Sequence, residues 1–310
     1  MDPVTKAVLL SWAWRWDVTL LLFVMGGLYV TGWIRLRKRT YVSRRRNRPH
    51  LVVWWRLIAY LSGLILVGVA LMSPIDVLSQ QLFFMHMIQH LLLIMIAPPL
   101  LMIANPMPFL LWGLPTRWRH KAGRVLSYLL HRESSTRNLV VKLTAPGIIF
   151  MFWIISVIGW HDPTLYNAAL RYEIIHDIEH LFFFAAGMLF WWHVTGAGPR
   201  LHKQFGIVAR IVFVLAAVPP NMFLGIVLAF ASVPIYSYYE GVPRLWVNDV
   251  VIDQTIGGVI MWIPGSMMYI IAVLILLTKL FDQEGHKPPL DEKLWASDEA
   301  MAAPGIGHEK

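Results

Sequence analysis

The sequence between residues 82 and 103 reads LFFMHMIQHLLLIMIAPPLLMI and contains no charged residue. A bilayer core about 30 Å thick is spanned by roughly 20 apolar residues in a helix, so this stretch predicts a transmembrane helix. His86 and His90 stand four residues apart within it. At about 3.6 residues per turn, such a pair lies on one helix face, where both imidazoles can reach one ion or one ring.

The same spacing occurs again at His176 and His180, inside the apolar stretch 174–194. Titratable side chains at membrane depth are costly, and they usually mark a site or a pathway. A single histidine in a membrane helix is often only a hydrogen-bond partner of a neighbouring helix. Two matched pairs favour a shared site, and one shared ion requires ring nitrogens of the two pairs within about 5 Å of each other.

Seven apolar segments are long enough to cross a bilayer: 18–34, 52–72, 82–103, 143–159, 174–194, 207–231 and 256–278. The expected fold class is therefore all-α, a polytopic membrane helical bundle with about seven transmembrane helices. Pro98 and Pro99 are expected to end the third span. Residues 1–282 form the transmembrane domain in this interpretation, and 283–310 are predicted to be a disordered cytoplasmic tail.

The distribution of basic residues sets the expected orientation. Of the 27 Lys and Arg residues, only Lys6, Arg15, Arg171 and Arg244 fall on the side of the N-terminus. Because Lys and Arg concentrate in cytoplasmic loops, the N-terminus is predicted outside and the C-terminus in the cytoplasm. The net charge of +9 is then a signal of topology and of contact with anionic lipid, and nucleic acid is not an expected partner.

The chain has no cysteine, which excludes disulfides, thiolate metal sites and thiol redox chemistry. Four imidazoles from two helices suit copper, zinc or a haem iron. In the predicted orientation all four lie in the outer half of the membrane, and the predicted metal ligands are His86, His90, His176 and His180. The residues expected to support them or to line the route to them are Asp76, Met85, Met87, His161, Asp162 and Asp253. Asp177 and Glu179 are expected to point to other faces of their helix.

The residues leave more than one function open. Histidines from two helices could clamp one haem axially in a redox protein. Pro219 and Pro264 interrupt the sixth and seventh spans, as happens in transporters, so a carrier of metal ions is a further alternative. Neither pair shows the His-Glu-x-x-His pattern of metalloproteases, and no enzyme activity is predicted.

Several motifs resemble the CtaG membrane family of cytochrome c oxidase assembly factors, over roughly residues 50–280. They are Ser73-Pro74-Ile75-Asp76, the run at 84–93 with Ala97-Pro98-Pro99-Leu100, His161-Asp162-Pro163 with Tyr166-Asn167, the His176-x-x-x-His180 helix, and Asp253-Gln254-x-x-Gly257-Gly258 with Trp262-Ile263-Pro264-Gly265.

This resemblance implies a seven-helix protein of the bacterial plasma (inner) membrane that helps to mature a haem–copper oxidase, by binding copper and delivering it to the oxidase. Its implied partners are oxidase subunits, membrane lipid and an external copper donor. An unrelated single-span copper chaperone that uses cysteines shares the family's name. The absence of cysteine and the seven expected spans put this chain outside that group.

Overall fold

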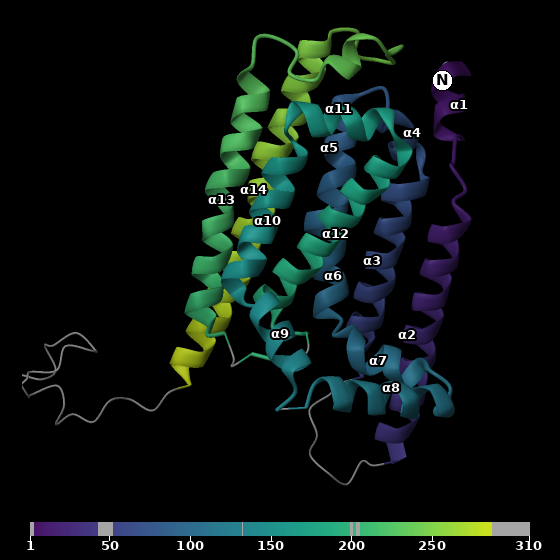
Figure 1. Cartoon of the computed structure of the whole chain (residues 1–310), viewed down its shortest axis with the longest axis vertical. Helices are drawn as coiled ribbons and strands as arrows, with labels where there is room; N and C mark the ends of the chain where they lie inside the picture. The colour runs from purple at the N-terminus through teal and green to yellow at the C-terminus, as the bar shows by residue number, and fades with distance from the viewer. Residues whose placement is uncertain (1–2, 43–51, 132, 199–200, 203–204, 287–310) are drawn as a thin grey trace, which may run out of the picture.

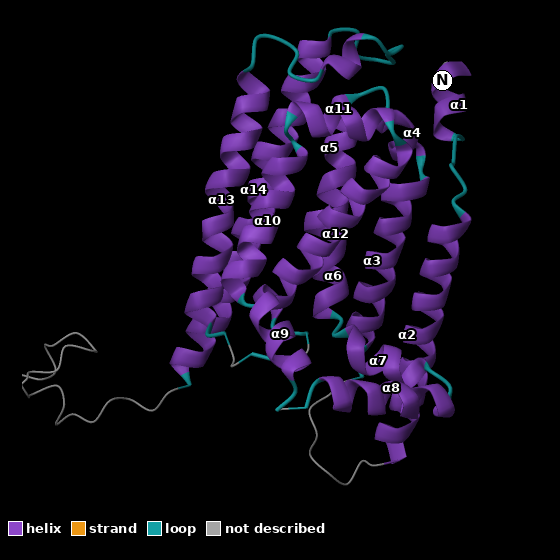
Figure 2. Ribbon diagram, viewed as in Figure 1, coloured by secondary structure: helices purple, strands orange, loops and turns teal. Residues whose placement is uncertain are grey.

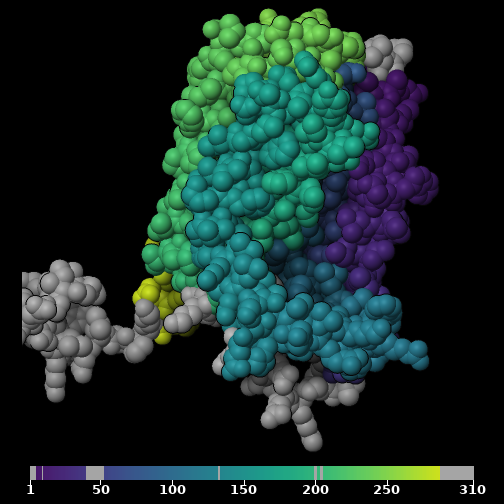
Figure 3. Space-filling view, in the orientation of Figure 1, coloured from purple at the N-terminus to yellow at the C-terminus, as the bar shows by residue number. Residues whose placement is uncertain are grey.

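The computed structural model describes residues 3–42, 52–131, 133–198, 201–202 and 205–286. Every regular element within these residues is a helix, as Figures 1 and 2 show. The expected all-α fold class is therefore confirmed. The long helices run side by side along the long axis of the molecule (Figure 1), and the space-filling view (Figure 3) shows them packed together on this face.

Six of the helical segments are long and apolar enough to cross a membrane. They are α2 (Trp16–Val42), α3 (Trp54–Met72), the run Phe83–Ile103, α12 (Glu173–Thr195), α13 (Ile207–Phe230) and α14 (Val250–Gly285). The pair α9 (Ser135–Leu143) and α10 (Pro146–Trp160) adds a seventh if its two parts form one span. The chain is thus a multi-pass helical membrane protein with six or seven spans.

Some boundaries differ from the expected ones. In the region of the expected fourth span, 143–159, helix α10 begins at Pro146, and α9 before it is bent away by 52°. A proline restricts the residue before it to extended conformations, which explains this break. Helix α14 continues to Gly285, so the expected domain boundary at 283 falls inside a helix. The remainder of the predicted tail, residues 287–310, lies outside the described residues.

Shorter helices lie at the two ends of the bundle (Figure 1). One end, called the N-terminal end below, carries α1 (Pro3–Leu9), α4 (Pro74–Ser79), α11 (Pro163–Arg171) and the 3₁₀ turn η2 (Ser237–Glu240). The opposite end, called the C-terminal end, carries α7 (Pro106–Gly113), α8 (Thr116–Leu129) and α9. Helices α5 and α12 both start at the N-terminal end, so their first turns lie at the same depth.

Pro98 and Pro99 do not end the third span, which corrects the expectation from the sequence. Helix α5 (Phe83–Leu91) passes into a π-helical turn, η1 (Leu92–Ile96), and then into α6 (Ala97–Ile103), where the prolines occupy the first turn. Pro98 has no N–H for the carbonyl four residues earlier. That carbonyl, of Ile94, instead accepts a hydrogen bond of 3.1 Å from the indole of Trp191 on α12.

Close packing fixes α12 against this turn. A Cβ atom at Gly187 would lie 2.7 Å from the carbonyl oxygen of Ile94, so the absence of a side chain lets the two backbones approach. The same region therefore combines a glycine contact with the hydrogen bond from Trp191. Together they set the position of α12 relative to the helix that carries His86 and His90.

Candidate metal centre

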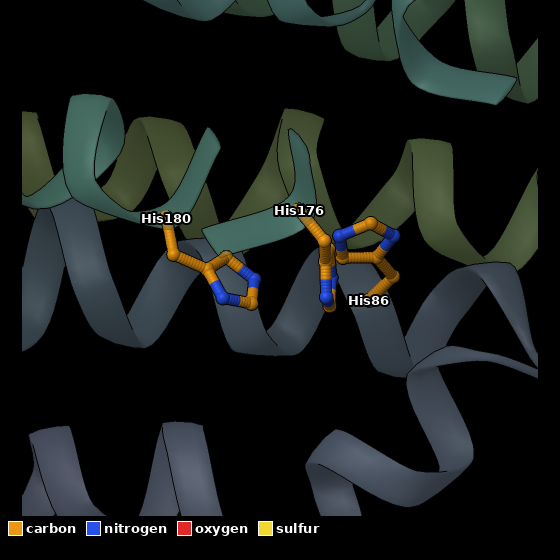
Figure 4. Close-up of side chains that lie close together, drawn as sticks. All are labelled: His86, His176 and His180. Carbon is orange, nitrogen blue, oxygen red and sulfur yellow. The ribbon is translucent and has the colours of Figure 1, made fainter. Parts of the chain in front are cut away.

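The two histidine pairs meet inside the bundle near its N-terminal end. The ring of His86 lies 5.1 Å from that of His176 and 6.1 Å from that of His180, centroid to centroid, and the ring of His90 lies 5.8 Å from that of His180. Ligand atoms of His86, His176 and His180 all lie within 4.8 Å of one another (Figure 4). This meets the separation of about 5 Å that one shared ion requires. All four rings are buried.

Glu179 joins the histidines, contrary to the expectation that it faces elsewhere. Its carboxylate oxygens lie 3.6 Å from Nε2 of His86 and 3.5 Å from Nε2 of His90, and its side chain is fully buried. Glu179 follows His176 by three residues, and residues three apart share a helix face. That spacing was the signal in the sequence that could have identified it.

His161, which ends α10, is also part of the cluster. Its ring lies 5.8 Å from that of His90, and its Nδ1 donates a hydrogen bond of 2.6 Å to the carbonyl of Val157. Because Nδ1 holds the proton, Nε2 carries the lone pair. Burial lowers the pKa of His161 to about 4, so the ring is neutral at physiological pH, which is the form that binds metals.

The atoms that face the middle of this cluster have no hydrogen-bond partner among the described residues. They are Nε2 of His86, His161, His176 and His180, both ring nitrogens of His90 and both carboxylate oxygens of Glu179. An unpaired buried polar atom costs about 1–3 kcal/mol. This many unpaired atoms in one place are therefore unusual for a region that only packs helices. Imidazole nitrogens with a carboxylate are a donor set that fits a transition-metal ion.

Two tyrosines outside the spans orient His86. The hydroxyl of Tyr166 on α11 lies 2.7 Å from Nδ1 of His86 and 3.3 Å from the hydroxyl of Tyr239, which donates to the carbonyl of Ser79 at 2.8 Å. Burial raises the pKa of both tyrosines, so both keep their protons. If His86 donates from Nδ1, the chain of bonds runs in one direction to Ser79 and leaves Nε2 free to bind a metal.

Tyr236 completes this aromatic group. Its ring stacks on that of Tyr166 at 3.9 Å, and its hydroxyl donates to the carbonyl of His161 at 3.1 Å. Tyr236 and Tyr239 come from the loop that follows α13. No sequence pattern identifies these two tyrosines, since a residue between spans has no periodicity to reveal which part of the bundle it contacts.

Asp253 supports the site by capping α5. Its carboxylate accepts hydrogen bonds from the backbone N–H groups of Phe83 at 2.8 Å and Phe84 at 3.0 Å, and it pairs with Arg244. The first N–H groups of a helix have no partner inside the helix, so this contact from α14 satisfies them. Asp253 therefore fixes the start of the helix that carries His86.

Asp76 bonds to Gln89, the residue before His90, and not to a histidine. It accepts a hydrogen bond of 2.7 Å from Nε2 of Gln89, which also donates to the carbonyl of Ala70 at 2.8 Å. These bonds hold α5 against α3 and α4. Burial raises the pKa of Asp76 to about 6, and the hydrogen bond from Gln89 opposes this in part.

The remaining predicted residues are not brought into the cluster. Met87 is buried in an apolar group with Phe83 and Tyr166, beside Gly257 of α14, and Met85 is only partly buried. Asp162 is exposed and caps α11, where it accepts from the N–H groups of its second and third following residues at 2.9 and 3.2 Å.

Comparison with known proteins gives a family but no characterised close relative. An uncharacterized protein of Mycobacterium bovis and one of Mycobacterium tuberculosis are each 26% identical to the chain over 310 residues, covering 96% of it. An uncharacterized protein of Mycobacterium leprae is 26% identical over 87% of the chain. The chain spans 40–44% of the length of these curated relatives. No solved structure matches it.

The family model of the cytochrome c oxidase caa3 assembly factors (Caa3_CtaG) matches residues 27–283. This range includes all the histidines of the cluster, Glu179 and the residues that orient them. The chain therefore belongs to the cytochrome c oxidase caa3 assembly factor family.

Proposed function

We propose that this protein assists the assembly of a haem–copper cytochrome c oxidase by binding copper at the buried cluster and passing it to the oxidase. The ligands are His86, His90, His176 and His180, together with Glu179, and His161 lies at the edge of the same group. Family membership supports the part in oxidase assembly, and the donor atoms support the part in metal binding.

The observation that carries this proposal is the group of unpartnered nitrogen and oxygen atoms that converge from α5, α10 and α12. A metal ion compensates several such atoms at once. Imidazole is a good ligand for copper and zinc, and the chain offers no thiolate to compete with it. Copper is the ion that a haem–copper oxidase would need from such a protein.

The packing of the rings favours an ion over a haem. A haem clamped between His86 and His180 would need the space beside both rings. The ring of His90 lies 4.2 Å from that of His86, and the ring of His176 lies 4.1 Å from that of His180. These neighbours fill the positions that a macrocycle would occupy.

The surroundings of the site favour delivery from one side of the membrane over transport across it. On the side of the C-terminal end, Phe183 stacks on the ring of His90 at 4.2 Å, and Trp153, Phe190 and Tyr269 are buried beyond it. A layer of apolar and aromatic groups is a poor path for a cation. In the orientation predicted from the basic residues, the N-terminal end of the bundle, nearest to the cluster, faces the exterior of a bacterial plasma membrane. A copper donor and the oxidase would reach the protein on that side.

Metal analysis of the purified protein tests the proposal. Wild-type protein in detergent, stripped and then reloaded with copper, should retain it after gel filtration, and His90→Ala/His180→Ala should retain less than about a tenth as much. His193→Ala is the matched control, since His193 is an equally buried histidine of α12 that bonds to the carbonyl of Thr144 at 2.9 Å. Equal copper in wild type and the double variant would remove these residues as ligands.

Two further measurements separate the alternatives and test the part in assembly. A Soret band in the purified protein would indicate haem, and counterflow of labelled copper in proteoliposomes would indicate transport. In cells that lack this protein, the absorbance of assembled oxidase should fall, and the wild-type gene should restore it while the double variant does not.

A further inference from the structure

The ligand atoms of the cluster form two groups of three that have one member in common. His86, His176 and His180 each offer a ligand atom within 4.8 Å of the other two, and His86, His90 and Glu179 do the same. Three protein ligands are enough to hold a copper or zinc ion. Figure 4 shows the three-histidine group.

His86 cannot serve both groups at the same time. Its Nδ1 faces the hydroxyl of Tyr166 at 2.7 Å, and its Nε2 has no hydrogen-bond partner and lies 3.6 Å from Glu179. The ring therefore offers one nitrogen to a metal. An imidazole nitrogen has one lone pair, so it binds one ion, and a full set of ligands in one group leaves the other group incomplete.

Resting on the proposed copper site, we infer that the cluster holds a single copper ion in either of two positions, with His86 as the ligand common to both. In passing between them, the ion keeps its bond to Nε2 of His86. It loses His176 and His180 and gains His90 and Glu179, and any protons on the new ligand atoms leave to solvent.

The two positions differ in access and in charge. His176 lies in the first turn of α12 and is 7% exposed, whereas Glu179 and His90 lie about one turn further along their helices and are 0% and 3% exposed. His176 also adjoins Asp177, which pairs with Arg15 at the N-terminal end. The three-histidine position is thus the one nearer to the N-terminal end of the bundle, and in this proposal the ion enters and leaves through it.

The position formed by His86, His90 and Glu179, called the inner position below, differs from the three-histidine position in its preference for the charge of the ion. Three neutral imidazoles carry no charge, whereas a carboxylate attracts a cation strongly where the surroundings are apolar. The inner position should therefore hold Cu(II) more tightly than the outer one. Residence at Glu179 and release through His176 and His180 would let one protein both retain copper and give it up to a partner.

The test counts copper ions and identifies their ligands in the full chain loaded with Cu(II) in detergent. Elemental analysis of the wild type should give one copper per chain. Glu179→Gln and His176→Ala should each still bind one copper, since each leaves one group intact. Their paramagnetic resonance spectra should differ, with three nitrogens bound in Glu179→Gln and two nitrogens with an oxygen in His176→Ala. His86→Ala should weaken binding by more than about 100-fold, because it removes a ligand from both groups.

Each result decides between the claims. Two coppers per wild-type chain, or identical spectra for Glu179→Gln and His176→Ala, would overturn the two-position arrangement and leave the proposed copper site standing. No copper in the wild type would overturn the proposed function itself. If His86→Ala fails to fold, the comparison of Glu179→Gln with His176→Ala still decides the question, with His193→Ala as the control for losing a buried histidine of α12.

Discussion

Replacing Tyr166 by Phe removes one oxygen atom, 2.7 Å from Nδ1 of His86, and leaves the ring stacked on that of Tyr236. When His86 binds copper through Nε2, its proton is on Nδ1 and donates to this oxygen. The variant leaves that N–H buried without its partner, which costs about 1–3 kcal/mol. Because 1.4 kcal/mol is a factor of ten in affinity, copper binding should weaken by about 5- to 150-fold.

The structure narrows this range. The hydroxyl of Tyr239 lies 3.4 Å from the same nitrogen and can take over part of the bond. Tyr166→Phe alone should therefore lose about 10-fold in affinity, near the lower end, and Tyr166→Phe/Tyr239→Phe about 100-fold. This matches the cost of about 10- to 100-fold that is typical for a group that orients a metal ligand.

Competition with a chelator of known copper affinity measures the effect on the purified protein. The matched control is Tyr29→Phe, which also removes a buried hydroxyl, one that donates at 3.0 Å to the carbonyl of Ala104, between α6 and α7 and not in the histidine cluster. It should leave copper affinity unchanged. If the affinity of the double variant is within twofold of wild type, these tyrosines do not determine which nitrogen of His86 is free to bind copper, and the reasoning is refuted.

Other consequences can be measured on the same protein. Asp253→Asn leaves the buried Arg244 without its charge partner and should lower the free energy of unfolding in mixed micelles by about 3–5 kcal/mol, and an unchanged value would contradict the capping of α5 by Asp253. The pKa of Asp76 is about 6 in the folded protein and 3.8 ordinarily, so the folded state binds its proton more tightly; wild-type stability should fall by up to about 3 kcal/mol as pH rises from about 4 to 6, and Asp76→Asn should flatten this slope. Copper at 100 times its dissociation constant should stabilise the protein by about 2.7 kcal/mol in a thermal melt, a chelator should reverse this, and His90→Ala/His180→Ala should show neither effect.

The sequence predicted the spans and the shared face of each histidine pair because both follow from periodicity within one helix, whereas it left open whether the two pairs meet. Apolar runs of about 20 residues identify spans, and an i, i+4 pair identifies a shared face. Glu179 satisfies the same rule at i+3 from His176, but a carboxylate near a helix start is equally expected at the lipid headgroups. Burial decides between the two, and burial depends on which helices are neighbours.

The features that the sequence did not reveal depend on contacts between segments far apart in the chain. Asp253 caps a helix that starts 170 residues earlier, and Tyr239 reaches His86 from 153 residues away. The π-helical turn before Pro98 requires an outside donor for the carbonyl of Ile94, and Trp191 on another span supplies it. No local pattern encodes such a pairing.

The protein contains its own reference for a histidine that only joins helices. His193 is buried in α12, like His176 and His180, but its Nε2 is bonded to the carbonyl of Thr144 at 2.9 Å. A histidine kept for packing satisfies its ring in this way, because an unpaired buried nitrogen costs about 1–3 kcal/mol. In the cluster, Nδ1 of His86 and of His161 have such partners, whereas Nε2 of all five histidines and both carboxylate oxygens of Glu179 do not. Five unpartnered Nε2 atoms beside an unpartnered carboxylate are what ligands of one common ion need, and a histidine that only joins helices, such as His193, uses its Nε2 for a hydrogen bond instead.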